Sequence, residues 1–484
     1  MAIVPYAVLQ PPFKTPDAAE QFAKAFAILG GHLIGGNLVG HQGGLWVPVS
    51  IAKLFDIFNN AGPVTANDFS ATSNLHWGTS TVFLSSSHSI IFPFTSSAYA
   101  PYGYLPQAAG AELGRLLGAS VLVTYYLMCT INAAVSVGLS YLAMRTARIG
   151  RPLLFATLCL PTTLLLYFSV SQDAIVIALG VLLYALISRS LASPPATRHD
   201  YLREIAFIDL VAVLLISSRF VYVPLLLLPL LIAPPRNEAT SEVPGLGDWA
   251  TSWVGRGWGG RGLALALSAA CVPIALAWPL VGFAAHYYGS YYPGASVYHQ
   301  LHYEVHHPVS AAHAILSTIH HQARAWWVSM LGVLGWLTVR LPDWTYLGLS
   351  VALVGLAVLP LAGGYGDPWG RDDASESSTA AVPRRATVGV VTVIALGLSV
   401  VLLIESQYLI WTPVGMNQAL GVTGRYFIPL LPFVALVASV FTRSTSLVRR
   451  LAPLGWVCAA AIGGSVVVVA IVYVGSYWAV GGGV

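Results

Sequence analysis

Acidic and basic side chains stand at the boundaries of apolar runs in this sequence of 484 residues. Asp17 follows a proline-rich stretch, Asp173 lies in a short polar turn between two apolar runs, and Arg219 and Arg425 lie where such runs end or begin. A carboxylate can accept a proton, and a guanidinium group can bind an anion through two parallel hydrogen bonds. These residue types therefore permit proton transfer by a carboxylate and anion binding by an arginine.

Asp17, Asp173 and Arg425 also have ordinary structural explanations. Asp17 has the position of a helix N-cap, and Glu20 three residues later completes a capping-box pattern. Asp173 is well placed to cap the helix that follows it. Arg425 at the head of an apolar run is typical of an arginine that reaches lipid headgroups, and the aromatic segment 99–107 is typical of a belt at the membrane surface. The residues alone leave both explanations open.

The composition indicates whether the chain is a soluble protein or a membrane protein. Apolar residues make up 56% of the chain, charged residues make up 9%, and the mean hydropathy is +0.72. A soluble core of this size does not bury so much apolar surface, so the class is an all-α, polytopic membrane protein. The net charge of +4 comes without a basic, aromatic-rich face, and we expect no nucleic-acid partner. The four cysteines lie inside apolar runs without metal-ligand spacing and are interpreted as core residues.

About ten apolar runs are candidates to cross roughly 30 Å of hydrocarbon, or eleven if a missing N-terminal span is counted. The two runs on either side of Arg219 are short and predict a broken or re-entrant pair. The candidate spans are residues 119–145, 150–170, 172–190, 204–218, 220–233, 262–285, 344–363, 387–405, 426–442 and 452–477.

The arginines predict which ends of the spans face the cytoplasm. Fifteen of the twenty arginines fall in polar joints that alternate with arginine-poor joints, so the arginine-rich joints should be cytoplasmic. The other five lie on the opposite face or at span ends, where arginine should be scarce and needs a reason. These five are Arg115, Arg219, Arg324, Arg340 and Arg425.

This arrangement of the candidate spans across the membrane divides the chain into four parts. We expect an outer-face loop domain with interfacial helices, a first membrane bundle, a second outer loop rich in His, Trp and Tyr, and a set of C-terminal membrane helices. They correspond to residues 1–104, 105–285, 286–343 and 344–484. A chain that begins outside needs a preceding span, so we expect one N-terminal to the sequence given; translocation of an almost uncharged N-terminus is the alternative.

Six motifs in order resemble a bacterial membrane family, domain of unknown function 2142, which is grouped with the glycosyltransferases of the GT-C fold. The resemblance runs from about residue 11 to residue 442, and its most specific parts are the YLPQ motif and the last motif. The motifs are PPFKTPD (11–17), YAPYGYLPQAAG (99–110), SQDA (171–174), SRFVYVPLLLL (218–228), GWLTVRLPDW (335–344) and GRYFIPLLP (424–432).

The resemblance implies a GT-C-like architecture and transfer of a sugar from a polyprenyl-phosphate donor to an acceptor at the outer face of the inner membrane. Such enzymes carry a catalytic carboxylate in the first outer loop, which is the position of Asp17. The family continues with a second acid and a histidine that this chain lacks, and Glu20 supplies a displaced carboxylate one turn later. The candidate residues for binding substrate or phosphate are Arg219, Arg425, Tyr104, Gln107, Asp173, Gln418 and Tyr426.

The resemblance also implies the partners: membrane lipid, the lipid-linked sugar donor, and an envelope glycan or lipid acceptor. The need for a divalent metal stays open. His302 and His306 are four residues apart and could ligate zinc from one helix face, although an interfacial helix or sugar stacking also explains the His- and Trp-rich stretch. A transporter or flippase and a non-catalytic membrane scaffold are the alternative functions.

Overall fold

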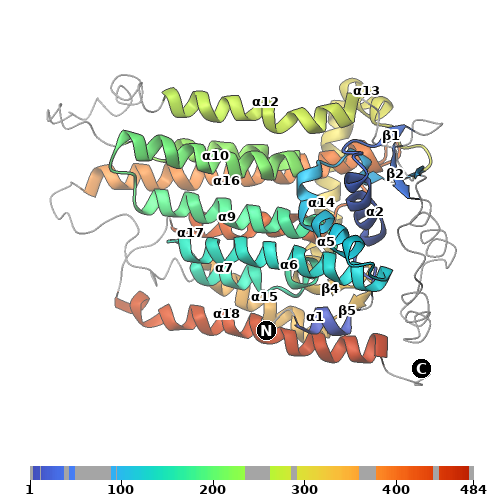
Figure 1. Ribbon diagram of the computed structural model, residues 1–484. Helices are drawn as coiled ribbons and strands as arrows, with labels where there is room; N and C mark the ends of the chain where they lie inside the picture. Colours follow the sequence, from blue (N-terminus) through green and yellow to red (C-terminus); the bar gives the residue numbers. More distant parts are fainter. Residues whose placement is uncertain are drawn as a thin grey trace.

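The structure is a computed structural model, and it is mostly helical (Figure 1). The residues that it describes are 4–10, 12–37, 43–48, 89–93, 95–234, 262–284, 292–358, 378–439 and 446–478. Most of the Ser/Thr-rich tract from residue 70 to residue 97, and the arginine-rich joints around Arg236, Arg256, Arg261, Arg371 and Arg443, lie outside the described residues.

The N-terminal part combines short helices with a small antiparallel sheet of order β1-β2-β3. Helix α2 buries most of its residues, and the ring of its Phe22 contacts the rings of Phe13, Phe26 and Tyr125. Figure 1 places α2, α5, β1 and β2 together at one end of the helix bundle. The elements here are α1 (Val4–Leu9), α2 (Ala18–Leu29), β1 (Gly36–Asn37), β2 (Gly43–Pro48), β3 (Ser89–Pro93), the 3₁₀ helices η2 (Thr95–Ala98) and η3 (Pro101–Tyr104), and α5 (Leu105–Leu116).

Five helices among the described residues are long and apolar enough to cross a membrane. Their apolar stretches overlap five of the expected spans, which supports a location in the membrane. These helices are α6 (Val121–Thr146), α9 (Asp173–Ala192), α12 (Leu263–Ala284), α16 (Ser378–Trp411) and α18 (Ser446–Tyr473).

The expected count of about ten continuous spans is not confirmed. The run 150–170 forms two short helices, and the second begins at Pro161. Proline has no amide hydrogen and its ring clashes with the preceding helical turn, so the first helix cannot continue through it. The helix before Arg219 is continuous, but the run after it folds as 3₁₀ helices, and the run headed by Arg425 begins as a 3₁₀ helix before it continues as a short α-helix. Prolines lie inside both 3₁₀ stretches. The shorter elements are α7 (Arg151–Leu158), α8 (Pro161–Tyr167), α10 (Arg198–Ser218), η4 (Phe220–Leu227), η5 (Pro229–Leu231), α15 (Asp343–Val358), η8 (Gly424–Phe433), α17 (Val434–Ser439) and the π-helical turn η9 (Val474–Trp478).

Helix α9 lies at the centre of the bundle. Its sequence is apolar on all sides, and its residues from Asp173 to Ser188 are all buried. It packs against α6 on one side and α10 on another, and α10 packs in turn against α12. The first residue of this central helix is Asp173, so the fold places a carboxylate at one end of its most buried element.

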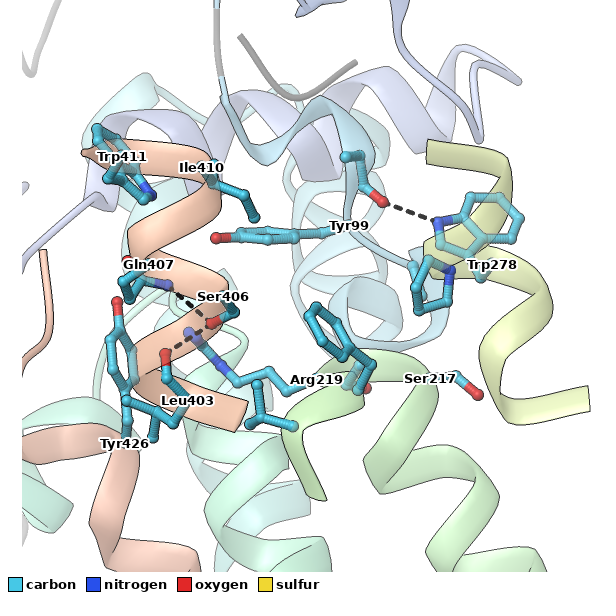
Figure 2. Close-up of a pocket in the computed structure, with 16 residues that line it drawn as sticks. Tyr99, Ser217, Arg219, Trp278, Leu403, Ser406, Gln407, Ile410, Trp411 and Tyr426 are labelled. Carbon is cyan, nitrogen blue, oxygen red and sulfur yellow. Dashed lines mark hydrogen bonds between the residues drawn. The ribbon is translucent and has the colours of Figure 1, made fainter. Parts of the chain in front are cut away.

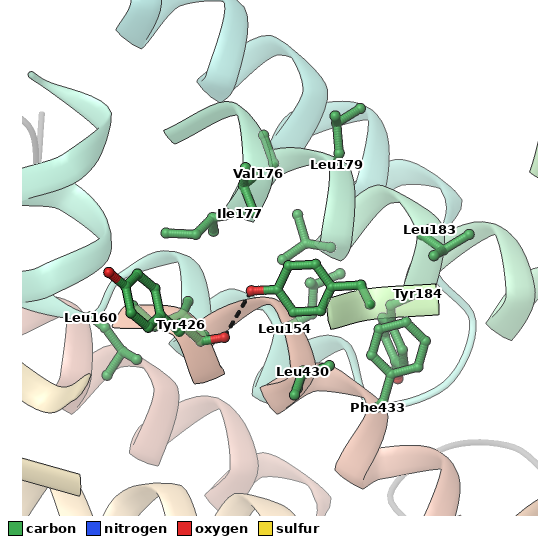
Figure 3. Close-up of a cluster of buried hydrophobic side chains, with 14 of the residues drawn as sticks. Leu154, Leu160, Val176, Ile177, Leu179, Leu183, Tyr184, Tyr426, Leu430 and Phe433 are labelled. Carbon is green, nitrogen blue, oxygen red and sulfur yellow. Dashed lines mark hydrogen bonds between the residues drawn. The ribbon is translucent and has the colours of Figure 1, made fainter. Parts of the chain in front are cut away.

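Close packing brings η8 against α9. Figure 3 shows Phe433 of η8 beside Tyr184 of α9, with Leu430 and then Tyr426 farther along η8, and the rings of Phe433 and Tyr184 meet edge to face at 5.4 Å. A Cβ atom added at Gly180 would lie 2.6 Å from Cβ of Pro429, so only glycine allows this approach. The contact fixes η8 along α9 and carries Arg425 to the level of Asp173.

The segment from α13 to β5, which was expected to form the second outer loop, supplies helices at the same end of the bundle as α2. Its helix α14 packs on η8, where Oγ of Ser329 accepts a hydrogen bond from the amide of Gly424 at 2.9 Å. The elements of this segment are α13 (Val297–His306), α14 (Pro308–Gly332) and the short hairpin β4 (Val333–Leu334) and β5 (Val339–Arg340).

Candidate functional site

Two aspartates and two arginines meet at the start of α9, and we call Asp17, Asp173, Arg219 and Arg425 the Asp–Arg cluster. Nη2 of Arg219 lies 2.5 Å from Oδ1 of Asp173, and Nε of Arg425 lies 3.2 Å from Oδ2 of the same carboxylate. Nη2 of Arg425 also donates to Oδ2 of Asp17 at 2.5 Å. When both carboxylates are ionised, the two positive and two negative charges cancel.

Asp173 is held by the turn that precedes α9. The amide of Asp173 donates to Oγ of Ser171 at 3.1 Å, so a serine hydroxyl supports the first turn of the helix. The carbonyl oxygen of Ser171 accepts hydrogen bonds from Gln107 at 3.2 Å and from Asn132 at 3.1 Å. The Asp173 carboxylate is therefore free of the N-cap role that the sequence suggested, and it binds both arginines at a helix end that favours negative charge.

Arg219 lies where α10 ends and η4 begins. Its backbone is extended, with φ −149° and ψ 103°, which turns the chain out of the helix. The guanidinium carbon lies 4.3 Å from the centre of the Tyr426 ring, a cation–π distance. Since the side chain is only 13% exposed, a salt bridge and an aromatic face take the place of water.

Arg425 is buried, and this overturns the snorkelling explanation. Its side chain is 7% exposed and points to the two aspartates. Nη2 also donates to the hydroxyl of Tyr426 at 3.1 Å. Nη1 has no hydrogen-bond partner among the described residues, so one edge of the guanidinium group is buried without a protein acceptor.

Asp17 does not cap α2, which corrects the capping-box pattern. Its backbone is left-handed, with φ 59°, and its side chain makes no cap hydrogen bond. Phe13, four residues earlier, is also left-handed, so the approach to Asp17 holds two unusual backbone conformations. With its side chain 40% exposed, Asp17 is the most exposed member of the cluster.

Glu20 joins η2 to α2 and does not complete a capping box. Oε2 of Glu20 accepts a hydrogen bond from the amide of Ser96 at 3.2 Å, and Oγ of Ser96 donates to the Glu20 carbonyl at 3.4 Å. These contacts set the position of η2 and of the aromatic residues after it. The candidate Glu20 thus lies beside the cluster with its carboxylate engaged by a backbone amide.

Two tyrosines of the segment 99–107 also lie by the cluster. Burial raises the pKa of Tyr99 and the pKa of Tyr104 well above the usual value, and the charge of Arg219 opposes this shift in both. Both phenols therefore stay protonated and can donate hydrogen bonds. The Tyr104 hydroxyl is buried and has no hydrogen-bond partner in the part of the chain that the structure describes.

A pocket adjoins the cluster between η4, α12 and α16 (Figure 2). Arg219 extends across it towards α16, and Tyr426 lines it from η8. On the side of α12, Nε1 of Trp278 donates to the carbonyl of Ala98 at 3.1 Å, which joins α12 to η2. The lining combines aromatic rings with hydroxyl and amide groups, namely Tyr99, Trp278, Trp411, Ser217, Ser406 and Gln407.

Other candidates lie at different places. Gln107 supports the turn before α9 and does not contact the arginines through any hydrogen bond described here. Gln418 is half-buried in the loop before η8, and no described hydrogen bond or ion pair links it to the cluster. His302 and His306 are exposed and stack at 4.1 Å, and the described residues contain no group of three or more metal-ligand side chains.

The five unusual arginines separate into two groups. Arg115, Arg324 and Arg340 are exposed, and Arg115 pairs with Glu112 on its own helix. Arg219 and Arg425 are the two that turn inward. Sequence reasoning missed the pocket residues Trp278 and Gln407, and the only available signal was a polar amide inside an apolar run at Gln407.

A comparison with protein families matches residues 1–434 to the family described as predicted membrane protein, DUF2142. No curated protein and no solved structure matches the chain. Since the matched region covers most of the sequence, the chain belongs to the DUF2142 family of predicted membrane proteins.

Proposed function

We propose that the protein is a GT-C-type glycosyltransferase that moves a sugar from a polyprenyl-phosphate donor to an envelope glycan or lipid acceptor at the outer face of the bacterial inner membrane. The observation that carries the proposal is the Asp–Arg cluster. It joins two buried arginines to a partly exposed carboxylate that lies 408 positions from Arg425 in the sequence. Arginine pairs suit phosphate, and a carboxylate beside them suits proton removal.

The proposed reaction divides its work between these groups. The acceptor hydroxyl oxygen bonds to the anomeric carbon of the donor sugar, and its proton passes to the carboxylate of Asp17. The bond between the anomeric carbon and the phosphate oxygen breaks, and its electron pair leaves on the lipid phosphate. Arg219 and Arg425 stabilise the charge that grows on that phosphate, which is where electrostatic catalysis acts.

The pocket gives the transferred sugar a place beside the phosphate. Tyr99 and Trp278 offer ring faces for a pyranose, and Ser406 and Gln407 offer hydroxyl and amide groups for its hydroxyls. Because Arg219 lines both the pocket and the cluster, a ligand with a sugar and a phosphate can engage both.

The first test is the variant Asp17→Asn in a transfer assay with purified protein in nanodiscs and radiolabelled polyprenyl-phosphate sugars. We expect transfer to fall at least about a hundredfold, the lower range for loss of a general base. Asparagine tolerates the left-handed backbone of this position and removes no helix cap, so the variant should fold. The matched control is Glu112→Gln, which removes one charge from an exposed ion pair. Unchanged transfer by Asp17→Asn excludes the catalytic role.

Transport is the second candidate, and one observation favours it. Asp209 of α10 is 2% exposed and lies in the more apolar second half of that helix, and its carboxylate accepts a hydrogen bond from Ser268 of α12 at 3.0 Å. Ionisable groups at membrane depth often mark the pathway of a transported substrate. Flux of a labelled lipid-linked sugar across proteoliposomes that is lost in Asp209→Asn and kept in Asp17→Asn would favour transport over transfer.

A further inference from the structure

The Asp–Arg cluster is electrically neutral when both of its aspartates are ionised. Both arginines already have carboxylate partners, so an entering phosphate meets a neutral site. Placing another anion among buried groups without a compensating change is unfavourable. One of the two aspartates must therefore give way when the phosphate binds.

The environments of the two aspartates differ. Asp173 is 7% exposed, contacts both arginines and stands at the start of the central helix. Asp17 is 40% exposed, contacts only Arg425 among the described ion pairs, and belongs to a loop with a left-handed backbone. The bond between Asp17 and Arg425 is thus the one that costs least to break.

Arg425 also has unused donors for a new ligand. Its Nη1 is buried without a hydrogen-bond partner in the described structure, and the same is true of Nε of Arg219. A buried donor without an acceptor is destabilising, and a phosphate oxygen would supply the missing acceptor. A phosphate can use these donors together with the Nη2 position that Asp17 now occupies.

We propose that Asp17 is an exchangeable ligand of Arg425. An anionic lipid phosphate displaces its carboxylate from the guanidinium group, and the displaced carboxylate then becomes available to accept the proton of the acceptor hydroxyl. The exchange rests on the proposed function for its ligand. It makes the base available only when a donor is bound, because without a donor Asp17 is held by Arg425.

The test is the affinity of the purified protein in nanodiscs for geranylgeranyl phosphate, with geranylgeraniol as the uncharged control. Since Asp17 competes with the phosphate, Asp17→Asn should bind geranylgeranyl phosphate about tenfold more tightly, a gain of roughly 1.4 kcal/mol. Arg425→Gln should weaken binding, and Asp17→Asn combined with Arg425→Gln should bind no better than Arg425→Gln alone. Glu112→Gln should change the affinity less than twofold, because its charge lies outside the cluster.

An equal or weaker affinity in Asp17→Asn overturns the exchange, because Asp17 then orients Arg425 or leaves it untouched. Absence of binding to both the wild type and Asp17→Asn overturns it too. The comparison of the wild type with Asp17→Asn tests the exchange even if Arg425→Gln does not fold. If Asp17→Asn binds more tightly and keeps full transfer activity, the exchange is supported and the base role of Asp17 is refuted. If Asp17→Asn binds with unchanged affinity and loses transfer, the base role is supported and the exchange is refuted.

Discussion

Asp173 and the two arginines form a buried ionic group whose members depend on each other. Asp173 contacts both guanidinium groups, and all three side chains are at most 13% exposed. Removing one partner of a buried pair typically costs about 3–5 kcal/mol, because the remaining charge keeps no counterpart. Asp173 is therefore an unsuitable residue for testing catalysis, and Asp17 at the exposed side of the cluster is the suitable one.

Lys24 gives a prediction at the same scale, because it is a fully buried lysine in the helix that follows Asp17. Burial lowers its pKa from 10.5 to about 7, and Nζ donates to the carbonyl of Leu33 at 3.1 Å. In the unfolded chain the lysine keeps its usual pKa, so the unfolded state binds more protons between about pH 7 and pH 10.5. The free energy of unfolding should rise with pH across this window and be lowest below pH 7, where the buried lysine is charged.

Thermal melting of the purified protein from pH 6 to pH 10 measures this effect. Lys24→Met should raise the melting temperature most at pH 6 and flatten the rise at higher pH. A melting curve whose pH dependence is the same in the wild type and in Lys24→Met would show that Lys24 is not the group responsible.

At the scale of elements, the site depends on how closely η8 approaches α9. Gly180→Ala places a methyl group 2.6 Å from Pro429 and should push η8 away from Asp173. Overpacking of this kind costs about 1–3 kcal/mol, so we expect a lower melting temperature together with weaker transfer. The control is Gly397→Ala in α16, where an added Cβ meets nothing within 4 Å and should leave stability equal or higher. Equal effects of the two substitutions would contradict the packing argument.

Sequence patterns predicted some of the helices and not others. Hydropathy located α6, α9, α12, α16 and α18, because long apolar helices carry a strong signal. It overestimated the run 150–170 as one span, since hydropathy ignores the backbone break before Pro161. Hydropathy also did not register the 3₁₀ backbone of η4 and η8, although the prolines inside them are visible in the sequence.

At the scale of the whole molecule, the four members of the cluster could each be named from local motifs, yet their contact could not. Asp17 and Arg425 are separated by 408 positions, and no spacing rule predicts a bond over that distance. Asp17 and Asp173 also matched simple N-cap patterns, but neither side chain caps a helix in the structure. Only the packing of η8, α9 and the end of α10 shows that the inward arginines share one site.

The most direct test of the account is a cryo-electron-microscopy map of the protein in nanodiscs with a bound polyprenyl-phosphate sugar. The account predicts phosphate density between the guanidinium groups of Arg219 and Arg425, sugar density in the pocket beside Tyr99 and Trp278, and Asp17 turned away from Arg425. Phosphate density elsewhere, for example beside Asp209 between α10 and α12, would contradict it.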